Sequence, residues 1–134
     1  MHASTLSFRF AVILAIAGMI MGIVMAASGN HSVYPAHAHL NLLGWVGLFL
    51  IGIFYRYYPA LDASRIALVQ VGIWIFGTIV LTCGVVAIFL GHPEYEPLAI
   101  GGSLIVLADM LLFAFLVFRP ERSTTNVMRS APAE

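Results

Sequence analysis

The chain contains no lysine, and charged residues of every kind make up only 9% of its 134 residues. An ordinary soluble domain carries about 25% charged residues, which keep its surface in contact with water. Six arginines against six acidic residues leave no positive excess to neutralise phosphates, which argues against nucleic-acid binding. With 61% hydrophobic residues and a mean hydropathy of +0.99, the composition predicts an integral membrane protein whose main solvent is lipid.

Cysteine is almost absent as well. The single residue, Cys83, excludes an intrachain disulfide framework and a cysteine-rich metal cluster. We expect Cys83 to be a small buried packing residue. The sequence also lacks a glycine-rich phosphate loop, a Ser/His/Asp arrangement and a pair of carboxylates, so it offers no motif for those kinds of catalysis.

Four long apolar runs are what the sequence does contain, at residues 10–27, 35–55, 66–90 and 98–118. A helix needs about 20 apolar residues to cross a membrane, and no run alternates as a barrel strand would. We therefore predict an all-α protein with four transmembrane helices in one domain, residues 1–119, followed by a flexible polar tail at 120–134. A signal peptide is the alternative for the first run, which is long for that role.

The arginines fall on one side of this four-span topology. They precede the first span, flank the connection between the second and third, and follow the fourth. They are Arg9, Arg56, Arg65, Arg119, Arg122 and Arg129. The opposite connections carry only Glu94 and Glu96 as charged residues. Because arginine-rich loops stay in the cytoplasm, we expect both termini to be cytoplasmic, in a multi-pass protein of the bacterial inner membrane.

Two histidines near the start of the second span are the sharpest functional candidates, because polar groups are costly in lipid. His37 and His39 lie in the segment Pro35-Ala-His-Ala-His-Leu-Asn-Leu-Leu-Gly-Trp45. Residues two apart on an α-helix point about 200° apart. The pair therefore presents one imidazole on each flank of its helix instead of holding one ion between them. The alternative is a pair of interfacial histidines hydrogen-bonded near the lipid headgroups.

Two further residues share the flank of His37. Asn41 lies one turn further along the helix, within reach of a hydrogen bond that would orient a metal-binding imidazole. An interhelical hydrogen bond explains Asn41 at least as well. Gly44, one more turn along, allows another helix or a flat ring to approach closely.

Asp109 is the one carboxylate deep inside a span. In a functional role it would relay protons or pair with a propionate or a cation. The reading that we favour is an acid kept neutral by burial and hydrogen-bonded to Thr78, Thr82 or Gln70 of the third span.

The segment from His37 to Trp45 resembles the haem-ligating helix of haem–copper oxidase subunit I, in its nitric-oxide-reductase and cbb3-like branches. In that family, the first histidine of a His-x-His pair ligates the high-spin haem and the second ligates the low-spin haem. The resemblance implies these roles for His37 and His39, with Asn41 and Gly44 shaping the pocket. The haem would be non-covalent haem b, since no Cys-x-x-Cys-His motif is present.

The chain departs from this family in two ways. A catalytic subunit of the family has three arcs of four helices, and this chain has the size of one arc. The histidine cluster that binds the active-site copper is also missing, because Gly91-His-Pro-Glu-Tyr95 matches its His-Pro-Glu-Val-Tyr motif imperfectly and falls in a loop. The resemblance thus leaves open whether the chain is an oxidoreductase by itself, and it implies electron transfer or binding of O2 or NO.

A haem with two axial histidines needs ligands from two directions, and each flank of the second span offers one imidazole. A second chain must then supply the other ligand, unless His31 or His92 folds inward from an outer loop. Because a family subunit looks like three copies of this unit, we expect a homotrimer with haem between protomers, with a dimer around one haem as the second choice. A redox protein or a quinol is the expected electron partner.

Two other functions stay open at this point. The first is a non-catalytic accessory or assembly subunit of a respiratory complex, whose polar residues hold helices together. The second is a copper or other metal site formed by His37 or His39 across a symmetry axis. The methionines of the first span support it little, because Met25 alone reaches the outer half where the histidines lie.

Overall fold

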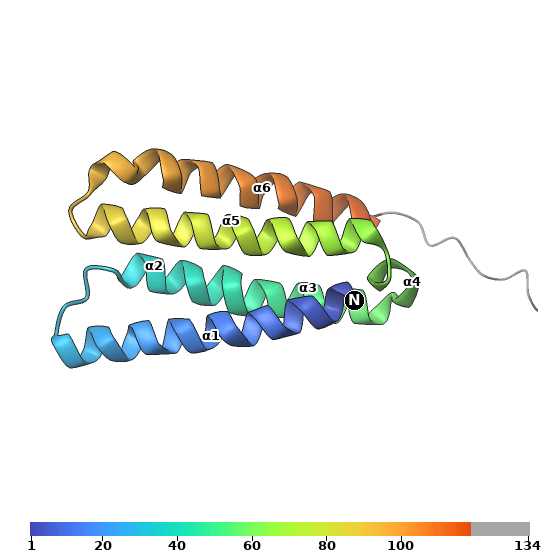
Figure 1. Cartoon of the computed structure of the whole chain (residues 1–134), viewed down its shortest axis with the longest axis horizontal. Coiled ribbons are helices and arrows are strands. Elements are labelled where there is room, and N and C mark those ends of the chain that lie inside the picture. The colour runs from blue at the N-terminus through green and yellow to red at the C-terminus, as the bar shows by residue number, and fades with distance from the viewer. Residues whose placement is uncertain (119–134) are drawn as a thin grey trace, which may run out of the picture.

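The structure, a computed structural model, describes residues 1–118 as an assembly of helices (Figure 1). Four segments are long and apolar enough to cross a membrane, and the described residues contain no strand. The elements are α1 (Ala3–Ser28), α2 (Tyr34–His39), η1 (Leu40–Gly47), α3 (Leu48–Tyr57), α4 (Pro59–Asp62), α5 (Arg65–Phe89), η2 (Pro93–Tyr95) and α6 (Glu96–Phe118).

The prediction of an all-α protein is confirmed for the described residues, and each of the four predicted spans is a helix long and apolar enough to cross a membrane. The second span is one continuous helix, Tyr34–Tyr57, made of α2, η1 and α3. Each predicted apolar run lies within its helix to within one residue. The polar tail predicted at 120–134, together with Arg119, lies outside the described residues.

The long helices lie side by side in the order α1, α2 to α3, α5 and α6 (Figure 1). α6 packs along α5, and α1 packs along η1 and α3, with a smaller contact to α5. The two outer helices of this row, α1 and α6, share no extensive contact within residues 1–118. The helices therefore form an open row, in which α6 has a single large neighbour.

The N-terminus of α1 is capped by the connection between the second and third spans. Asp62 of α4 accepts hydrogen bonds from the Ser4 backbone N–H at 2.7 Å and from the Ser4 hydroxyl at 2.8 Å. A carboxylate there satisfies a free N–H group and interacts favourably with the helix dipole. This cap explains why α1 begins at Ala3 and not at residue 10, where the apolar run begins.

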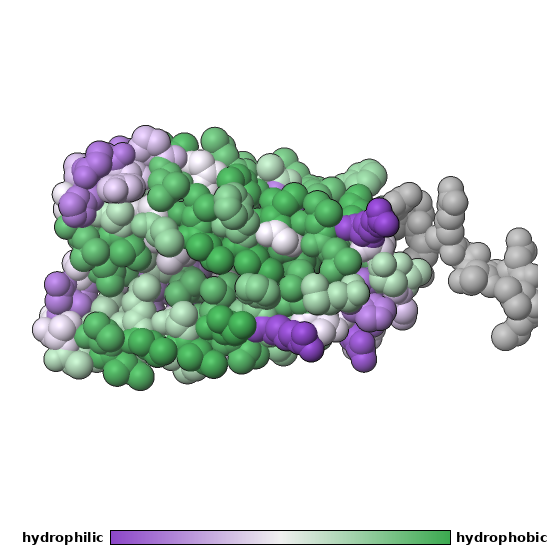
Figure 2. Space-filling model, in the orientation of Figure 1, coloured by the Kyte–Doolittle hydropathy of each residue, from purple (hydrophilic) through white to green (hydrophobic). Residues whose placement is uncertain are grey.

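Charged residues lie toward the two ends of the long helices, and the face drawn in Figure 2 is largely apolar between them. Arg9, Arg56 and Arg65 belong to the ends of α1, α3 and α5 that lie next to α4. Glu94 and Glu96 lie at the opposite end, in and beside η2. The arginines and the glutamates that the sequence places in alternate connections therefore lie at opposite ends of the folded helices.

Small residues bring α5 and α6 into close contact. A Cβ added at Gly84 would lie 2.5 Å from the backbone nitrogen of Ala99, and one at Gly102 would collide with the backbone of Leu81. Glycine at these positions lets the two backbones approach, as in many membrane helix pairs. The contact holds α6 in the row.

Candidate functional site

The second span changes helix type immediately after the two histidines. α2 carries His37 and His39, and the following element, η1, is a π-helix. π-helical segments are rare and occur frequently at functional sites. Trp74 of α5 braces this one, because its Nε1–H donates to the Leu43 carbonyl at 3.0 Å. Its ring lies against Gly47, where an added Cβ would be 3.1 Å from Cζ2.

The imidazole of His37 is held by α1. Its Nδ1 lies 2.9 Å from the carbonyl oxygen of Gly18. Because a carbonyl only accepts, Nδ1 carries the proton and Nε2 keeps its lone pair. Nε2 has no hydrogen-bond partner within residues 1–118. His37 thus offers one unoccupied nitrogen beside α1.

The imidazole of His39 is held by its own helix. Its Nδ1 donates to the carbonyl of Pro35, one turn earlier, at 2.7 Å. Its Nε2 likewise has no hydrogen-bond partner in the described part of the chain. Since His37 faces α1, the turn of the helix places His39 on the flank directed away from α1. Both side chains are half-buried.

Asn41 and Gly44, the other two candidates, both lie against α1. Asn41 donates from Nδ2 to the His37 carbonyl at 2.8 Å, and a Cβ at Gly18 would lie 2.5 Å from that same Nδ2. A Cβ at Gly44 would lie 3.0 Å from Cδ1 of Leu14. The space that Gly44 leaves for a helix or a flat ring is therefore filled by α1 of the same chain.

The two flanks differ in the room that they leave for a ligand. A Cβ at Gly22 of α1 would lie 3.0 Å from Cε1 and 3.7 Å from Nε2 of His37. A porphyrin is far wider than the imidazole that holds it, so a haem on His37 would meet α1. His39 lies on the other flank of the helix, away from Gly22, and its Nδ1 is held by its own helix. His39 is therefore the better placed of the two for a large flat ligand.

The donor set decides which kind of centre the site would suit. Within the described residues, no three or more side chains of His, Cys, Asp or Glu come together as metal ligands. A closed structural metal site of three or four protein ligands is thus not formed by this part of one chain. Axial ligation of haem iron needs one or two imidazoles, each oriented by a hydrogen bond from its other nitrogen. The residues present fit that role.

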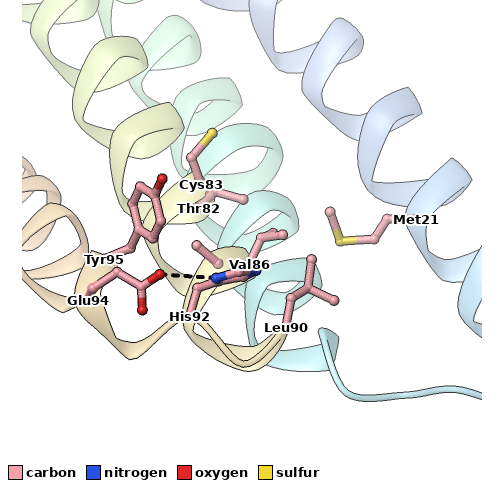
Figure 3. Close-up of a pocket in the computed structure, with 9 residues that line it drawn as sticks. Met21, Thr82, Cys83, Val86, Leu90, His92, Glu94 and Tyr95 are labelled. Carbon is pink, nitrogen blue, oxygen red and sulfur yellow. Dashed lines mark hydrogen bonds and ion pairs between the residues drawn. The ribbon is translucent and has the colours of Figure 1, made fainter.

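A groove of about 630 Å³ opens near η2, at one end of the long helices. Met21 of α1 lies on one side of the groove and α5 lies on the other (Figure 3). His92 pairs with Glu94 in it, with 3.0 Å between Nδ1 and Oε1. Cys83 also lines the groove and is exposed, so the prediction that it is buried is wrong. The reason is that the open row leaves this strip of α5 uncovered.

The buried carboxyl of the fourth span belongs to a network that joins three helices. Gln70 donates from Nε2 to Oδ2 of Asp109 at 2.6 Å, and the hydroxyl of Tyr55 donates to Oε1 of Gln70 at 2.8 Å. Of the three partners expected for Asp109, Gln70 is therefore confirmed. The hydroxyls of Thr78 and Thr82 are buried without a partner within residues 1–118. The network links α3, α5 and α6, as an interhelical contact would.

Comparisons of the chain with models of protein families, with curated proteins and with solved structures gave no match. The function must therefore be inferred from the site.

Proposed function

We propose that the chain is a membrane-embedded haem protein in which an imidazole of the second span ligates the iron of a haem b through Nε2. One observation carries this proposal. The Nδ1–H groups of His37 and His39 are both fixed by main-chain carbonyls, at 2.9 and 2.7 Å, while neither Nε2 has a partner in residues 1–118. His39 is the principal ligand because α1 restricts the space at His37.

Physical chemistry supports a ligand role for these nitrogens. An unpaired imidazole nitrogen inside a membrane has an unfavourable free energy, because lipid offers it no hydrogen bond. A hydrogen bond from Nδ1 to a carbonyl fixes the tautomer and raises the basicity of Nε2. Binding to iron would use that lone pair and remove the cost of leaving it unpaired.

The arrangement of the helices supports a relationship to one arc of haem–copper oxidase subunit I. The segment from His37 to Trp45 carries the resemblance in sequence, and the open row of four long helices has the size of one arc. Oxidase catalysis by one chain is not proposed, since metal-ligating side chains do not cluster within residues 1–118. When bound, the haem would supply a reversible one-electron change, which suits electron transfer or the binding of O2 or NO.

The charge distribution supports an orientation in the bacterial inner membrane. In this orientation, the ends of the long helices that carry the arginines face the cytoplasm. His37 and His39 then both lie in the outer half of the membrane. The chain would act as a homo-oligomer, because one copy supplies too few ligands on one side. Its electron partner would be a quinol or a redox protein that reaches this outer half.

The decisive experiment is an absorption spectrum of detergent-purified protein from haem-replete cells, first oxidised and then reduced. We expect a Soret band and sharp visible bands on reduction, with His39→Ala losing most of this absorption. His2→Ala is the matched control, because His2 lies beside Asp62, at the opposite end of the long helices from His39. A colourless wild-type protein from such cells would remove the haem proposal, and bound copper in that sample would favour a copper site instead.

A second candidate function is that of a non-catalytic accessory or assembly subunit. The observation that favours it is the exposure of α6, since only 17% of the most apolar window of the Pro93–Phe118 span is buried. An uncovered helix of this kind would suit docking to a larger respiratory complex. Co-purification with such a complex, with a spectrum unaffected by His39→Ala, would support this function over haem binding.

A further inference from the structure

The third span carries a stripe of polar side chains on the face that it buries. Gln70, Trp74, Thr78 and Thr82 follow one another at intervals of four residues on α5, and each is at most 6% exposed. Residues four apart lie on the same face of a helix. From residue 70 to residue 82 the stripe extends about 18 Å, more than half of a membrane core of about 30 Å. Because polar groups at such depth are costly, the stripe needs an explanation.

Hydrogen bonds between helices explain the half of the stripe that begins at Gln70. Gln70 donates to Asp109 and accepts from the hydroxyl of Tyr55. The Nε1–H of Trp74 donates to the carbonyl of Leu43. The hydroxyls of the two threonines have no partner within residues 1–118. A role in holding helices together therefore accounts for the first two residues of the stripe and leaves out the other two.

A threonine in a helix has another possible partner close by, the carbonyl oxygen four residues earlier. Ser103 of α6 uses this partner, since its hydroxyl donates to the Ala99 carbonyl at 2.9 Å. Within the described residues, the hydroxyls of Thr78 and Thr82 do not, although both are buried. A buried hydroxyl without a hydrogen bond has an unfavourable free energy. The two threonines thus keep hydroxyls that can bond to something other than their own helix.

Asp109 carries another buried oxygen without a partner, close to the same threonines. Its Oδ2 accepts from Gln70, whereas Oδ1 has no partner within residues 1–118. Gly77, which precedes Thr78, faces Ile105, because its added Cβ would lie 2.8 Å from Cγ2 of that residue. Asp109 follows Ile105 by four residues, or about 6 Å along the helix. Since α5 and α6 are antiparallel (Figure 1), Asp109 lies about one turn from Thr78, on the side of Gln70.

The other end of the stripe reaches the groove beside η2 (Figure 3). Thr82 lines this groove together with Cys83 and His92. Cys83 is exposed, and the side chains of His92 and Glu94 are 59% and 63% exposed. Groups that exchange protons with the surroundings therefore line the same groove as the outermost threonine of the stripe.

We infer that Asp109 exchanges its proton with the groove beside η2 through Thr78 and Thr82. Each hydroxyl accepts a proton on its oxygen from one side and releases its own proton to the other, so neither threonine is changed by a transfer. As neighbours one turn apart, their Cβ atoms are separated by about 5–6 Å, a gap that one bridging water spans. A proton that enters at the groove binds Oδ1 of Asp109 and converts the carboxylate to a carboxylic acid, and the reverse sequence releases it.

Infrared spectroscopy of the full-length protein in lipid vesicles tests this path. The carbonyl stretch of protonated Asp109 is the band that Asp109→Asn removes, and its shift after transfer to D2O measures the exchange of the proton. Thr78→Val and Thr82→Val should each slow this shift about tenfold, which corresponds to about 1.4 kcal/mol on the barrier. Thr82→Ser keeps a hydroxyl and should exchange at the wild-type rate. Ser103→Ala is the matched control, because its own helix holds that hydroxyl, and its rate should not change.

A stability measurement separates proton transfer from packing. Because the threonine hydroxyls are buried without a partner, Thr78→Val and Thr82→Val should leave the free energy of unfolding unchanged or raise it. Slower exchange accompanied by a loss of stability in both variants would show a packing role and overturn the inference. Wild-type exchange rates in both variants would also overturn it, as would a wild-type protein in which no carboxylic-acid band depends on Asp109 at any pH at which it is folded.

The single cysteine tests the entrance to the path. Cys83 is exposed in the groove, so a bulky maleimide attached to it should block the groove and slow the exchange. Cys83→Ala protein treated with the same reagent should exchange at the wild-type rate, and an unchanged rate in the labelled wild type would contradict entry at the groove. The exchange involves no haem, so a haem-free protein would overturn the proposed function and leave this inference intact.

Discussion

The Nδ1–H of His37 donates to the carbonyl of Gly18 at 2.9 Å, and this hydrogen bond joins the first two spans at the level of the candidate site. The two residues are 19 positions apart in sequence. Gly18 supports the contact in a second way, because its missing side chain makes room for Asn41. The flank of the second span that carries His37 is therefore part of an interface between helices.

Replacing Gly18 should loosen this interface. A Cβ at Gly18 would lie 2.5 Å from Nδ2 of Asn41, so Gly18→Ala must displace the amide or separate α1 from the second span. We expect a loss of about 1–3 kcal/mol in the free energy of unfolding, the usual cost of overpacking. Unfolding followed by circular dichroism in mixed micelles measures it. Gly72→Ala is the control, because nothing lies within 4 Å of its added Cβ, and an equal loss in both variants would contradict the prediction.

The contact between α5 and α6 offers a comparison of two adjacent glycines. A Cβ at Gly102 would collide with the backbone of Leu81, whereas one at Gly101 would meet nothing within 4 Å. Gly102→Ala should lower the free energy of unfolding by about 1–3 kcal/mol, because the collision is with backbone, which cannot move alone. Gly101→Ala should be neutral or stabilising, since alanine favours a helix over glycine by about 0.8–1 kcal/mol. Thermal unfolding of the two variants in the same detergent checks this, and a reversed order would show that α6 is not held in this way.

The network at Asp109 should behave as one unit. Gln70→Leu removes the donor to Asp109 and the acceptor for the hydroxyl of Tyr55 and leaves both groups buried. The expected loss in the free energy of unfolding is about 1–3 kcal/mol for each buried group left unpaired. Tyr55→Phe should cost less in the wild type and almost nothing more in Gln70→Leu, because its partner is already gone. A double-mutant cycle measures this coupling, with the exposed Tyr57→Phe as the control, and strictly additive losses would show that the three residues act separately.

Removing the cap of α1 should fray its first turns. Asp62→Ala deletes the acceptor of two hydrogen bonds from Ser4, one of them a backbone N–H. The loss of such a cap costs about 0.5–2 kcal/mol. We expect faster hydrogen exchange at the amides near Ser4, while the amides at the opposite end of α1 exchange as before. Glu94→Gln is the control, since that carboxylate is exposed and lies at the other end of the row, and unchanged exchange at Ser4 in Asp62→Ala would refute the capping role.

Much of the fold follows from residue types that act locally. Uncharged runs of sufficient length predict the four spans, and the position of Pro35 in the first turn of α2 follows from the missing N–H of proline. Gly29 ends α1 with a φ of 67°, a conformation that glycine adopts without strain. Gln70 was a foreseeable partner of Asp109, because two polar side chains in lipid have few other places to form a hydrogen bond.

Contacts between segments that are far apart in the chain could not be predicted from the sequence. No sequence motif marks Asp62 as the cap of α1, because that role depends on a chain turn that brings residue 62 next to residue 4. The hydrogen bonds that Tyr55 donates to Gln70 and Trp74 donates to the Leu43 carbonyl depend in the same way on how the helices pack. Cys83 was expected to be buried, but exposure depends on which strip of α5 the neighbouring helices cover.

By itself, the sequence determined that this chain is helical, has four helices long and apolar enough to cross a membrane and carries two imidazoles on different flanks of one helix, because hydropathy, loop residues and helical periodicity act over short distances. The tertiary structure decided which flank each imidazole faces and what covers it. The reason is that burial depends on how helices pack, so the same glycine spacing leaves room for a cofactor in one packing and receives a neighbouring helix in another. In this chain α1 takes that room at His37.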